Sequence, residues 1–393
     1  METTQPPAEA KPVETKPIEP VFDVLESIGK HVAQLKPYVP ERGLICIGEY
    51  PLKILLKEPL VEKITGILPI LVEKAEGEAA KPTQLAQVAA PQNTLKLDAD
   101  VDTHFWFNVN AYFAANEEVG ARLTKSTEKL HEVTLFASLW EGLGSALLPV
   151  LIAQFDKSNA SSVAIAVMPS RSQPSDAHFN ALASIGMCAA NNSAAVILVG
   201  RDFAEDYVGV DRNGSRMKGN GVVNYLLQMM LEKDTLTQEL SELSRAFNVK
   251  LYTGLSIMGA SYKVYASFES MLEAASLNPF LPFDLSSTAV VYVLVRVPHT
   301  LKDKLTKGRI ELATAEWAKK ITNVKSIYVS EPIYVDEASD RVDAVVFTGG
   351  FNLSEVASFL TKKSDKIKTE TVKKGLLKEK EWEAIVKSLT IGH

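Results

Sequence analysis

The sequence has little of what marks several protein classes. It contains only two cysteines, Cys46 and Cys188, and both lie in apolar stretches without the paired spacing of a metal site, so we expect buried free thiols. No apolar run reaches the ~18 residues of a membrane span. The first twenty residues lack the hydrophobic core of a signal peptide. We therefore expect a cytoplasmic protein without a transmembrane segment.

The chain also has no excess of basic charge and no catalytic motif of a common hydrolase. A net charge of −6 lacks the basic signature of a nucleic-acid-binding protein, so no nucleic-acid partner is expected. The six histidines are scattered without metal-ligand spacing, and no G-x-S-x-G pattern occurs. The acid-rich segment 200–214 lacks the ligand positions of an EF-hand and is expected to be a solvated loop.

What is present is an alternation of apolar strands and amphipathic helices. Strands are expected at 43–48, 95–100, 105–113, 132–138, 163–168 and 194–199, with helices between them, among them 52–77 and 176–190. This alternation is typical of a doubly wound α/β domain with a mostly parallel sheet. The pattern then continues as one long helix over 218–247, and from 285 it indicates a smaller α+β domain.

These patterns divide the chain into five parts. We expect a disordered, proline-rich tail (1–20), a nucleotide-type domain (21–217) that starts with an amphipathic helix (21–36), a core linking helix (218–247), an α+β domain (248–362) and a Lys-rich terminal helix or tail (363–393). The last part is interpreted either as a solvated helix or as a surface that contacts a filament neighbour, a membrane surface or a partner.

The stretch 137–150, "ASLWEGLGSALLPV", raises the question of a phosphate site. A triphosphate requires converging backbone N–H groups and little side-chain bulk. Gly142, Gly144 and Ser145, which precede a helix, satisfy that requirement. Glycine-rich turns between a strand and a helix are nevertheless common in α/β folds, so an ordinary helix start remains the alternative.

Three motifs in this order resemble the tubulin/FtsZ superfamily, including its archaeal CetZ branch. They are "AANEEVG" (114–120), "LFASLWEGLGSALLPVLI" (135–152) and "GVVNYLL" (221–227), and the resemblance spans roughly 40–355. It implies a site for GTP or GDP, with Mg²⁺ as a further candidate. The site residues that it implies are Gly48, Asp98, Asp100, Asn116, Gly120, Gly142, Gly144, Ser145 and Asn224.

Several of these residues have a simpler interpretation. Asp98 and Asp100 resemble the family's acidic loop near the metal, but they also fit an exposed turn after a strand. Asn224 matches the asparagine that reads guanine, but it also fits an ordinary amide on a helix.

The sequence departs from the family pattern at four places. After the first strand, Glu49, Tyr50 and Pro51 follow Gly48, and Trp140 and Glu141 replace glycines of the signature loop. Arg201 stands where the family commonly has an Asn. The acidic loop that the family sends into a neighbour's site is expected within 248–272, which contains no Asp.

The two carboxylates bear directly on binding. Two like charges ~4 Å apart repel by about 4 kcal/mol at an effective dielectric of ~20, so Glu49 and Glu141 oppose a bound phosphate. If the site holds no nucleotide, Trp140, Tyr50 and Pro51 are expected to fill part of it.

Two functions remain open at this point. The first is a cytoskeletal or scaffold protein with a degraded nucleotide site and little or no GTP hydrolysis, which acts by self-association into filaments or by assembly with a related subunit. The alternative is an active GTP-binding, GTP-hydrolysing filament subunit in cell division or cell shape. The sequence does not decide whether the protein is an enzyme.

Overall fold

The computed structural model describes residues 41–57, 67–74, 93–190, 195–207, 209–211, 213–217, 219–336 and 339–389. All of them belong to one unit, Glu41–His393. The tail predicted at 1–20 and the helix predicted at 21–36 lie outside the described residues.

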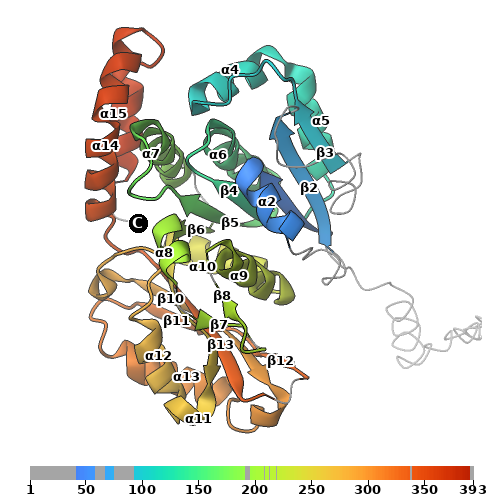
Figure 1. Ribbon diagram of the computed structural model, residues 1–393, viewed down its shortest axis with the longest axis vertical. Coiled ribbons are helices and arrows are strands. Elements are labelled where there is room, and N and C mark those ends of the chain that lie inside the picture. The colour runs from blue at the N-terminus through green and yellow to red at the C-terminus, as the bar shows by residue number, and fades with distance from the viewer. Residues whose placement is uncertain are drawn as a thin grey trace, which may run out of the picture. The chain divides into compact units, whose positions relative to one another are not determined.

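Six parallel strands form the first part of the sheet (Figure 1). Their order is β6-β5-β4-β1-β2-β3. The bounds of the strands are β1 Arg42–Ile47, β2 Ile67–Lys74, β3 Thr94–Leu97, β4 Glu132–Ser138, β5 Ser161–Met168 and β6 Ala195–Gly200. The helices between them are α2 Glu49–Lys57, α4 Trp106–Ala115, α5 Glu117–Thr127, α6 Gly142–Lys157 and α7 Ser175–Ala190.

Both faces of this parallel sheet are buried, and its side chains alternate between two cores. Along β5, Ala164 and Ala166 join the core with α6 and α7, while Val163, Ile165 and Val167 join the core with α2 and α9. A strand that is buried on both faces is apolar throughout, as these strands are. The predicted doubly wound α/β architecture is therefore confirmed.

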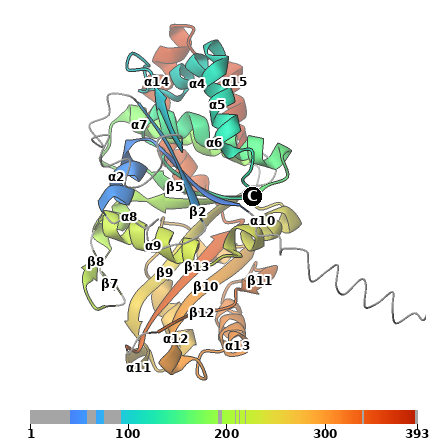
Figure 2. The same ribbon diagram turned by 90° about the vertical axis from the view of Figure 1, so that its right-hand side faces the viewer.

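The second half of the chain extends the same sheet. β6 pairs in parallel with β9, which pairs antiparallel with β13, and β13 pairs antiparallel with β10. The helices and strands of this second half are α8 Arg201–Asp206, β7 Gly209–Val210, β8 Arg216–Met217, α9 Asn220–Glu232, α10 Leu236–Phe247, β9 Leu251–Ser261, α11 Tyr262–Tyr265, α12 Phe268–Ala275, β10 Val290–Pro298, α13 Lys307–Ala318, β11 Ser326–Val329, β12 Ile333–Val335 and β13 Arg341–Gly349. The helices α12 and α13 cover one face of the antiparallel strands (Figure 2).

Four elements differ from their sequence predictions. Residues 106–115 form a helix instead of a strand, because Trp106 and Val109 are buried at helical spacing. Residues 67–74 form strand β2 rather than part of a helix. The predicted single helix over 218–247 is two helices, α9 and α10, and 201–206 is a helix rather than a loop.

A buried ionic network joins α9 to the antiparallel strands. Arg296 on β10 lies with its Nη1 2.6 Å from Glu232 Oε2 and donates from Nε to Asp343 Oδ2 at 2.8 Å. Asp343 Oδ2 also accepts from the Tyr225 hydroxyl at 2.9 Å, and Asp343 Oδ1 accepts from Gly259 N at 2.6 Å. Two residues of α9 and one residue each of β9, β10 and β13 are therefore linked by buried ion pairs and hydrogen bonds.

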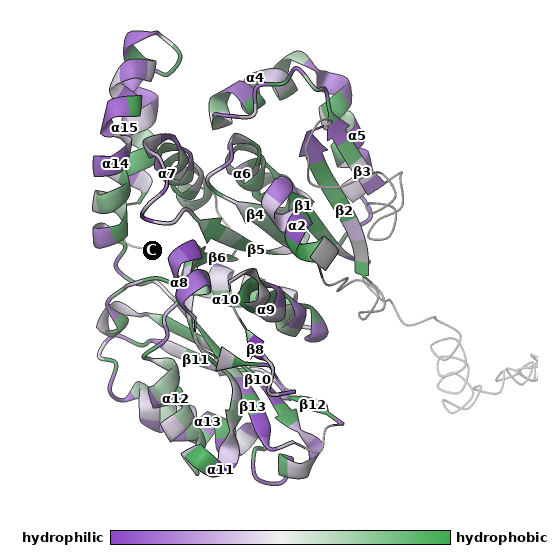
Figure 3. Ribbon diagram, in the orientation of Figure 1, coloured by the Kyte–Doolittle hydropathy of each residue, from purple (hydrophilic) through white to green (hydrophobic). Residues whose placement is uncertain are grey.

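Two C-terminal helices, α14 Ser354–Lys373 and α15 Glu379–Ser388, pack on α7. Trp382 stacks on Phe179 with ring centroids 4.7 Å apart. Both helices carry many hydrophilic residues, whereas the strands of the parallel sheet are mostly hydrophobic (Figure 3). The predicted division at 362/363 falls inside α14. Within the described ranges, no helix has the length and apolar character to cross a membrane.

Candidate functional site

The predicted phosphate loops lie at the carboxyl ends of β1 and β4, which are neighbours in the sheet. Gly48 follows β1 with a positive φ of 92°, a conformation that favours glycine. Its N–H donates to Val72 O on β2 at 2.9 Å. Helix α2 starts at the next residue, so backbone N–H groups without helical partners face this point.

The Glu141 carboxylate occupies the start of α2. Glu141 Oε2 accepts a hydrogen bond from Glu49 N at 3.1 Å. A Cβ on Gly48 would lie only 2.5 Å from the same oxygen. An anion at a helix N-terminus is favourable, and here the chain supplies that anion itself. Burial raises the pKa of the Glu141 carboxyl above its usual range, and the hydrogen bond from Glu49 N lowers it in part.

Aromatic rings fill the space beside this carboxylate. The Tyr50 and Trp140 rings meet edge to face with centroids 4.7 Å apart, and the Arg201 guanidinium lies 5.3 Å from the Trp140 ring centroid. Tyr50 and Pro51 are buried. Burial raises the pKa of Tyr50 to about 12. That Trp140, Tyr50 and Pro51 fill part of the cradle stays a prediction.

The start of α6 is covered by the segment that precedes α4. Gly142 N donates to Thr103 O at 3.0 Å, and a Cβ on Gly142 would lie 2.6 Å from the carbonyl carbon of Phe105. The backbone oxygen of Thr103 therefore takes an N–H that a phosphate would require. This contact could not be predicted from the sequence, since it depends on a segment almost forty residues away.

Gly144 and Ser145 serve the packing of the same turn. A Cβ on Gly144 would collide with the backbone oxygen of Ser138, so glycine is required for the close approach of α6 to β4. The Ser145 hydroxyl is buried and donates to Leu139 O at 2.9 Å. Each residue has a structural role here that needs no ligand.

Asn180 holds the covering segment in place, and sequence reasoning missed it. This side chain, 1% exposed on α7, accepts from Trp106 N at 3.1 Å and donates to His104 O at 2.8 Å. Its only signal in the sequence is an amide inside the mostly apolar helix segment "HFNALASIG".

These contacts do not fit a bound triphosphate. The start of α2 is capped by a carboxylate, and the first N–H of α6 is bonded to a carbonyl. A phosphate at this place would have to displace Glu141 and the segment 103–105.

Two other predicted residues come together at a single tyrosine. Tyr112 donates from its hydroxyl to Asp98 Oδ2 at 2.8 Å, and Asn116 Nδ2 donates to Tyr112 O at 2.9 Å. Asp98 and Asp100 are exposed in the turn after β3. Gly120 lies in α5, and a Cβ there would meet open space.

No group of three or more His, Cys, Asp or Glu residues that could hold a metal ion occurs in the described part of the chain.

Asn224 lies on α9 with 4% of its surface exposed. Its neighbours Val223 and Tyr225 belong to the core that also contains Tyr50. Its role in reading guanine stays a prediction.

The loop after the core helix differs from its predicted place. Because α9 ends at Glu232 and α10 starts at Leu236, the loop after the helix is 233–235, and it contains Asp234. The segment 248–272 instead contains strand β9. The expectation that this loop lacks an Asp was wrong. The loop was placed too late in the sequence, because the helical pattern resumes after only three residues and hides the break between α9 and α10.

Asp234 is exposed although it has a partner within the chain. Its Oδ1 lies 2.7 Å from Arg42 Nη1, and 83% of its side chain is exposed. Arg42 also donates from Nη2 to Leu231 O at 3.0 Å, which holds the end of α9 beside β1.

Both cysteines are buried and free, as expected. Burial raises the pKa of the Cys46 thiol well above its usual range and that of Cys188 to about 12. Neither thiol is therefore activated as a nucleophile.

No protein-family model and no curated protein matches this chain. Solved structures do match it. CetZ from Methanosaeta thermophila strain DSM 6194 is 13% identical, with 89% of this chain and 97% of that chain covered and a TM-score of 0.62. CetZ2 from Haloferax volcanii, a GTPγS-bound protofilament, is 18% identical, with 84% and 99% covered and a TM-score of 0.61.

A third match, CetZ1 from Haloferax volcanii as a GDP-bound monomer, is 14% identical, covers 84% of this chain and 99% of that chain, and has a TM-score of 0.61. Identities this low establish a shared fold. The chain therefore has the fold of the CetZ structures, as the resemblance of its motifs to the tubulin/FtsZ superfamily predicted.

Proposed function

We propose that this protein is a subunit of a tubulin/FtsZ-like filament or scaffold in the cytoplasm, with a nucleotide cradle that its own side chains fill. The observation that carries the proposal is the Glu141 carboxylate on the backbone of the β1–α2 turn. A protein with such a cradle assembles without being switched by GTP or GDP and hydrolyses GTP poorly or not at all.

The comparison with CetZ2, whose solved form is a protofilament, supports self-association as the mode of action. The partner is a second copy of this chain or a related subunit. A fold by itself does not establish chemistry, so the proposal depends on the contacts of Glu141 and Thr103 and not on the likeness alone.

A second function is favoured by one specific observation. Asp234 lies two residues after the end of α9 and is 83% exposed, and the resemblance implies that a carboxylate after this helix positions the attacking water in a neighbouring subunit. The alternative is therefore a GTP-hydrolysing filament subunit in cell division or cell shape, in which the cradle opens on assembly.

Assembly of the purified full chain distinguishes the two functions. Light scattering and sedimentation would be measured without nucleotide, with GTP and with GDP, each with Mg²⁺, together with phosphate release. The filled cradle predicts equal assembly in all three conditions and no phosphate release above the buffer rate. Assembly that requires GTP, with phosphate release that Asp234→Ala abolishes, would support the alternative.

Glu331→Ala provides a matched control for Asp234→Ala, since Glu331 is another exposed carboxylate close to the same loop. Lys233 Nζ contacts the backbone oxygen of Glu331 at 3.1 Å, so removal of the Glu331 side chain leaves that contact available. Phosphate release that falls equally in both variants would argue against a specific role of Asp234.

A further inference from the structure

A cavity of about 750 Å³ lies beside α8. Four segments form its wall: residues 168–172 after β5, α8 with the residues next to it, the loop 277–282, and the first turns of α14. None of the nine predicted site residues is among the described residues that line it. Its volume lies in the range of roughly 300–1,000 Å³ that is usual for small-molecule sites.

The wall of this cavity is fixed by backbone contacts. Gly200 N, at the end of β6, donates to Phe280 O at 2.8 Å. A Cβ on Gly200 would lie 2.8 Å from the same oxygen, so glycine permits this close approach. The loop 277–282 is thereby tied to the parallel sheet.

Most of the lining is apolar and remains partly accessible. Phe203 on α8 and Val356 and Phe359 on α14 are only half-buried. Leu277 is 82% exposed, the most exposed large hydrophobic side chain among the described residues. Burial of these surfaces by a ligand is favourable by about 25 cal/mol per Å².

The charged groups of the lining are mainly acidic. They are the carboxylates of Asp202, Asp206 and Glu355 and the guanidinium of Arg171. Asp202 Oδ2 accepts from Arg171 N at 2.9 Å. Within the described part of the chain, Asp206 and Glu355 have no hydrogen bond or ion pair, so both can accept one from a ligand.

We propose that this cavity binds a small amphipathic cation, with an aromatic or alkyl body against Phe203, Val356 and Phe359 and a protonated amine near Asp206 and Glu355. Lining groups of net charge −2, from three carboxylates and one guanidinium, favour a cation and disfavour a phosphate or carboxylate. The acid-rich segment 200–214, expected to be a solvated loop, thus supplies two of the three carboxylates through α8.

The direct test compares two probes of the same body and opposite charge, 4-phenylbutylamine and 4-phenylbutyrate, by titration calorimetry on the full chain. The proposal predicts saturable 1:1 binding of the amine, at least about tenfold tighter than that of the carboxylate, with an affinity that falls as salt rises. Equal or tighter binding of 4-phenylbutyrate, or no saturable binding of the amine, would overturn it.

Surface substitutions locate the site without disturbing the core. Asp206→Asn with Glu355→Gln should weaken amine binding at least about fivefold, and Leu277→Lys should weaken it while strengthening 4-phenylbutyrate binding. Glu311→Gln, an exposed carboxylate on α13 outside the lining, is the matched control and should change neither. Amine affinity that is unchanged in the double variant would show that the probe binds elsewhere and would refute the proposal.

Discussion

Among single residues, Glu141 explains most about the candidate site. Its carboxylate takes the N-terminus of α2, where the resemblance implies a phosphate. Because burial raises the pKa of this carboxyl, the folded protein binds its proton more tightly than the unfolded chain does. The group therefore favours folding most below its ordinary pKa, and this contribution is lost as the pH rises through the raised value.

Glu141→Gln tests that contribution. The free energy of unfolding of the wild type, minus that of the variant, should increase as the pH falls from 7 to 5, because only the wild type gains a proton on folding. Urea unfolding at both pH values measures the difference. Glu379→Gln is the control, because Lys368 lowers the pKa of Glu379 and this carboxyl is then ionised in both the folded and the unfolded chain at these pH values, so its difference should stay nearly constant. A difference for Glu141→Gln that is flat or reversed in sign would contradict the account.

Two of the predicted site glycines should respond oppositely to alanine. Gly144→Ala places a methyl group against the Ser138 backbone and should lower the free energy of unfolding by about 1–3 kcal/mol. Gly120→Ala places it in open space on α5 and should raise the free energy by about 0.5–1 kcal/mol. Chemical unfolding measures both, and a Gly144→Ala variant as stable as the wild type would refute the packing role.

The motif residues show what the sequence could and could not predict. The glycines at 142 and 144 were predicted as a phosphate loop from their spacing, but their contacts show that they allow close packing with Thr103 and Ser138. Those partners lie in other segments, so spacing could not identify them. Glu141 and Trp140 were the informative residues, because their charge and bulk already argued against a phosphate.

Among the elements, α9 is held to the antiparallel strands by charge as well as by apolar contact. Arg296 is fully buried and reaches Glu232 on the helix and Asp343 on β13. A buried pair is costly to break, since the partner that remains is left charged and unpaired. The network therefore favours one position of α9 relative to these strands.

Arg296→Met removes the cation from this network. It should lower the free energy of unfolding by about 3–5 kcal/mol. Combining it with Asp343→Leu should restore part of the loss, because the two residues are then both apolar. Thermal and urea unfolding measure the cycle. A double variant that is as unstable as the sum of the single variants would show that the two residues act independently.

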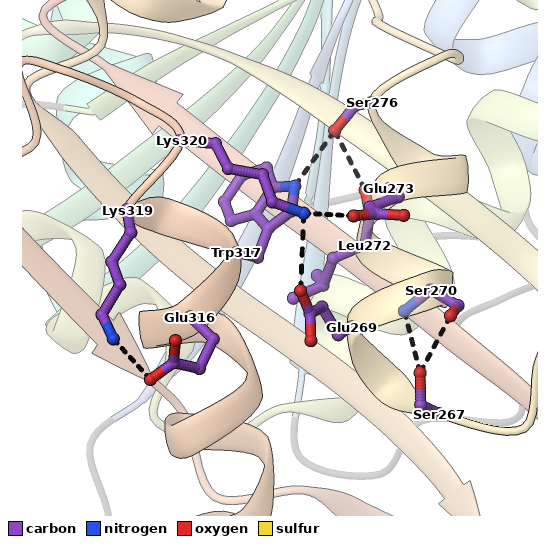
Figure 4. Close-up of polar contacts among 10 residues, drawn as sticks. All are labelled: Ser267, Glu269, Ser270, Leu272, Glu273, Ser276, Glu316, Trp317, Lys319 and Lys320. Carbon is purple, nitrogen blue, oxygen red and sulfur yellow. Dashed lines mark hydrogen bonds and ion pairs between the residues drawn. The ribbon is translucent and has the colours of Figure 1, made fainter.

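The control for this cycle is the exposed pair of Lys319 and Glu316 on the surface of the α13 region, drawn in Figure 4. Its two atoms are 2.6 Å apart, but solvent screens both. Lys319→Met should therefore change the free energy of unfolding by less than about 1 kcal/mol. A change as large as that of Arg296→Met would indicate a general charge effect instead of the buried network.

Helices and strands were predictable where the apolar residues followed one clear pattern along the segment. The strands β4, β5 and β6 are continuous apolar runs and were predicted close to their observed bounds. The segment 106–115 was mistaken for a strand because its aromatic residues have high strand propensity, although burial follows the helical period. The break between α9 and α10 spans three residues and interrupts the pattern too briefly to be seen.

At the scale of the whole molecule, the contacts in the cradle and the fixed position of α9 both support the proposed function. The fold is that of the CetZ structures, while Glu141, Thr103 and the Tyr50–Trp140 pair occupy the place that the resemblance gives to phosphates. The network around Arg296 in turn holds α9 in place. The proposed function expects such a subunit to keep one conformation and to assemble according to its concentration.

The most direct measurement is a calorimetric titration of the folded full chain with GTP and Mg²⁺ at neutral pH. The filled cradle predicts no binding heat up to millimolar nucleotide, which corresponds to less than about 4 kcal/mol of binding free energy. A dissociation constant tighter than ~10 μM, about 7 kcal/mol, would mean that Glu141 and the segment 103–105 move aside, and it would contradict the central claim.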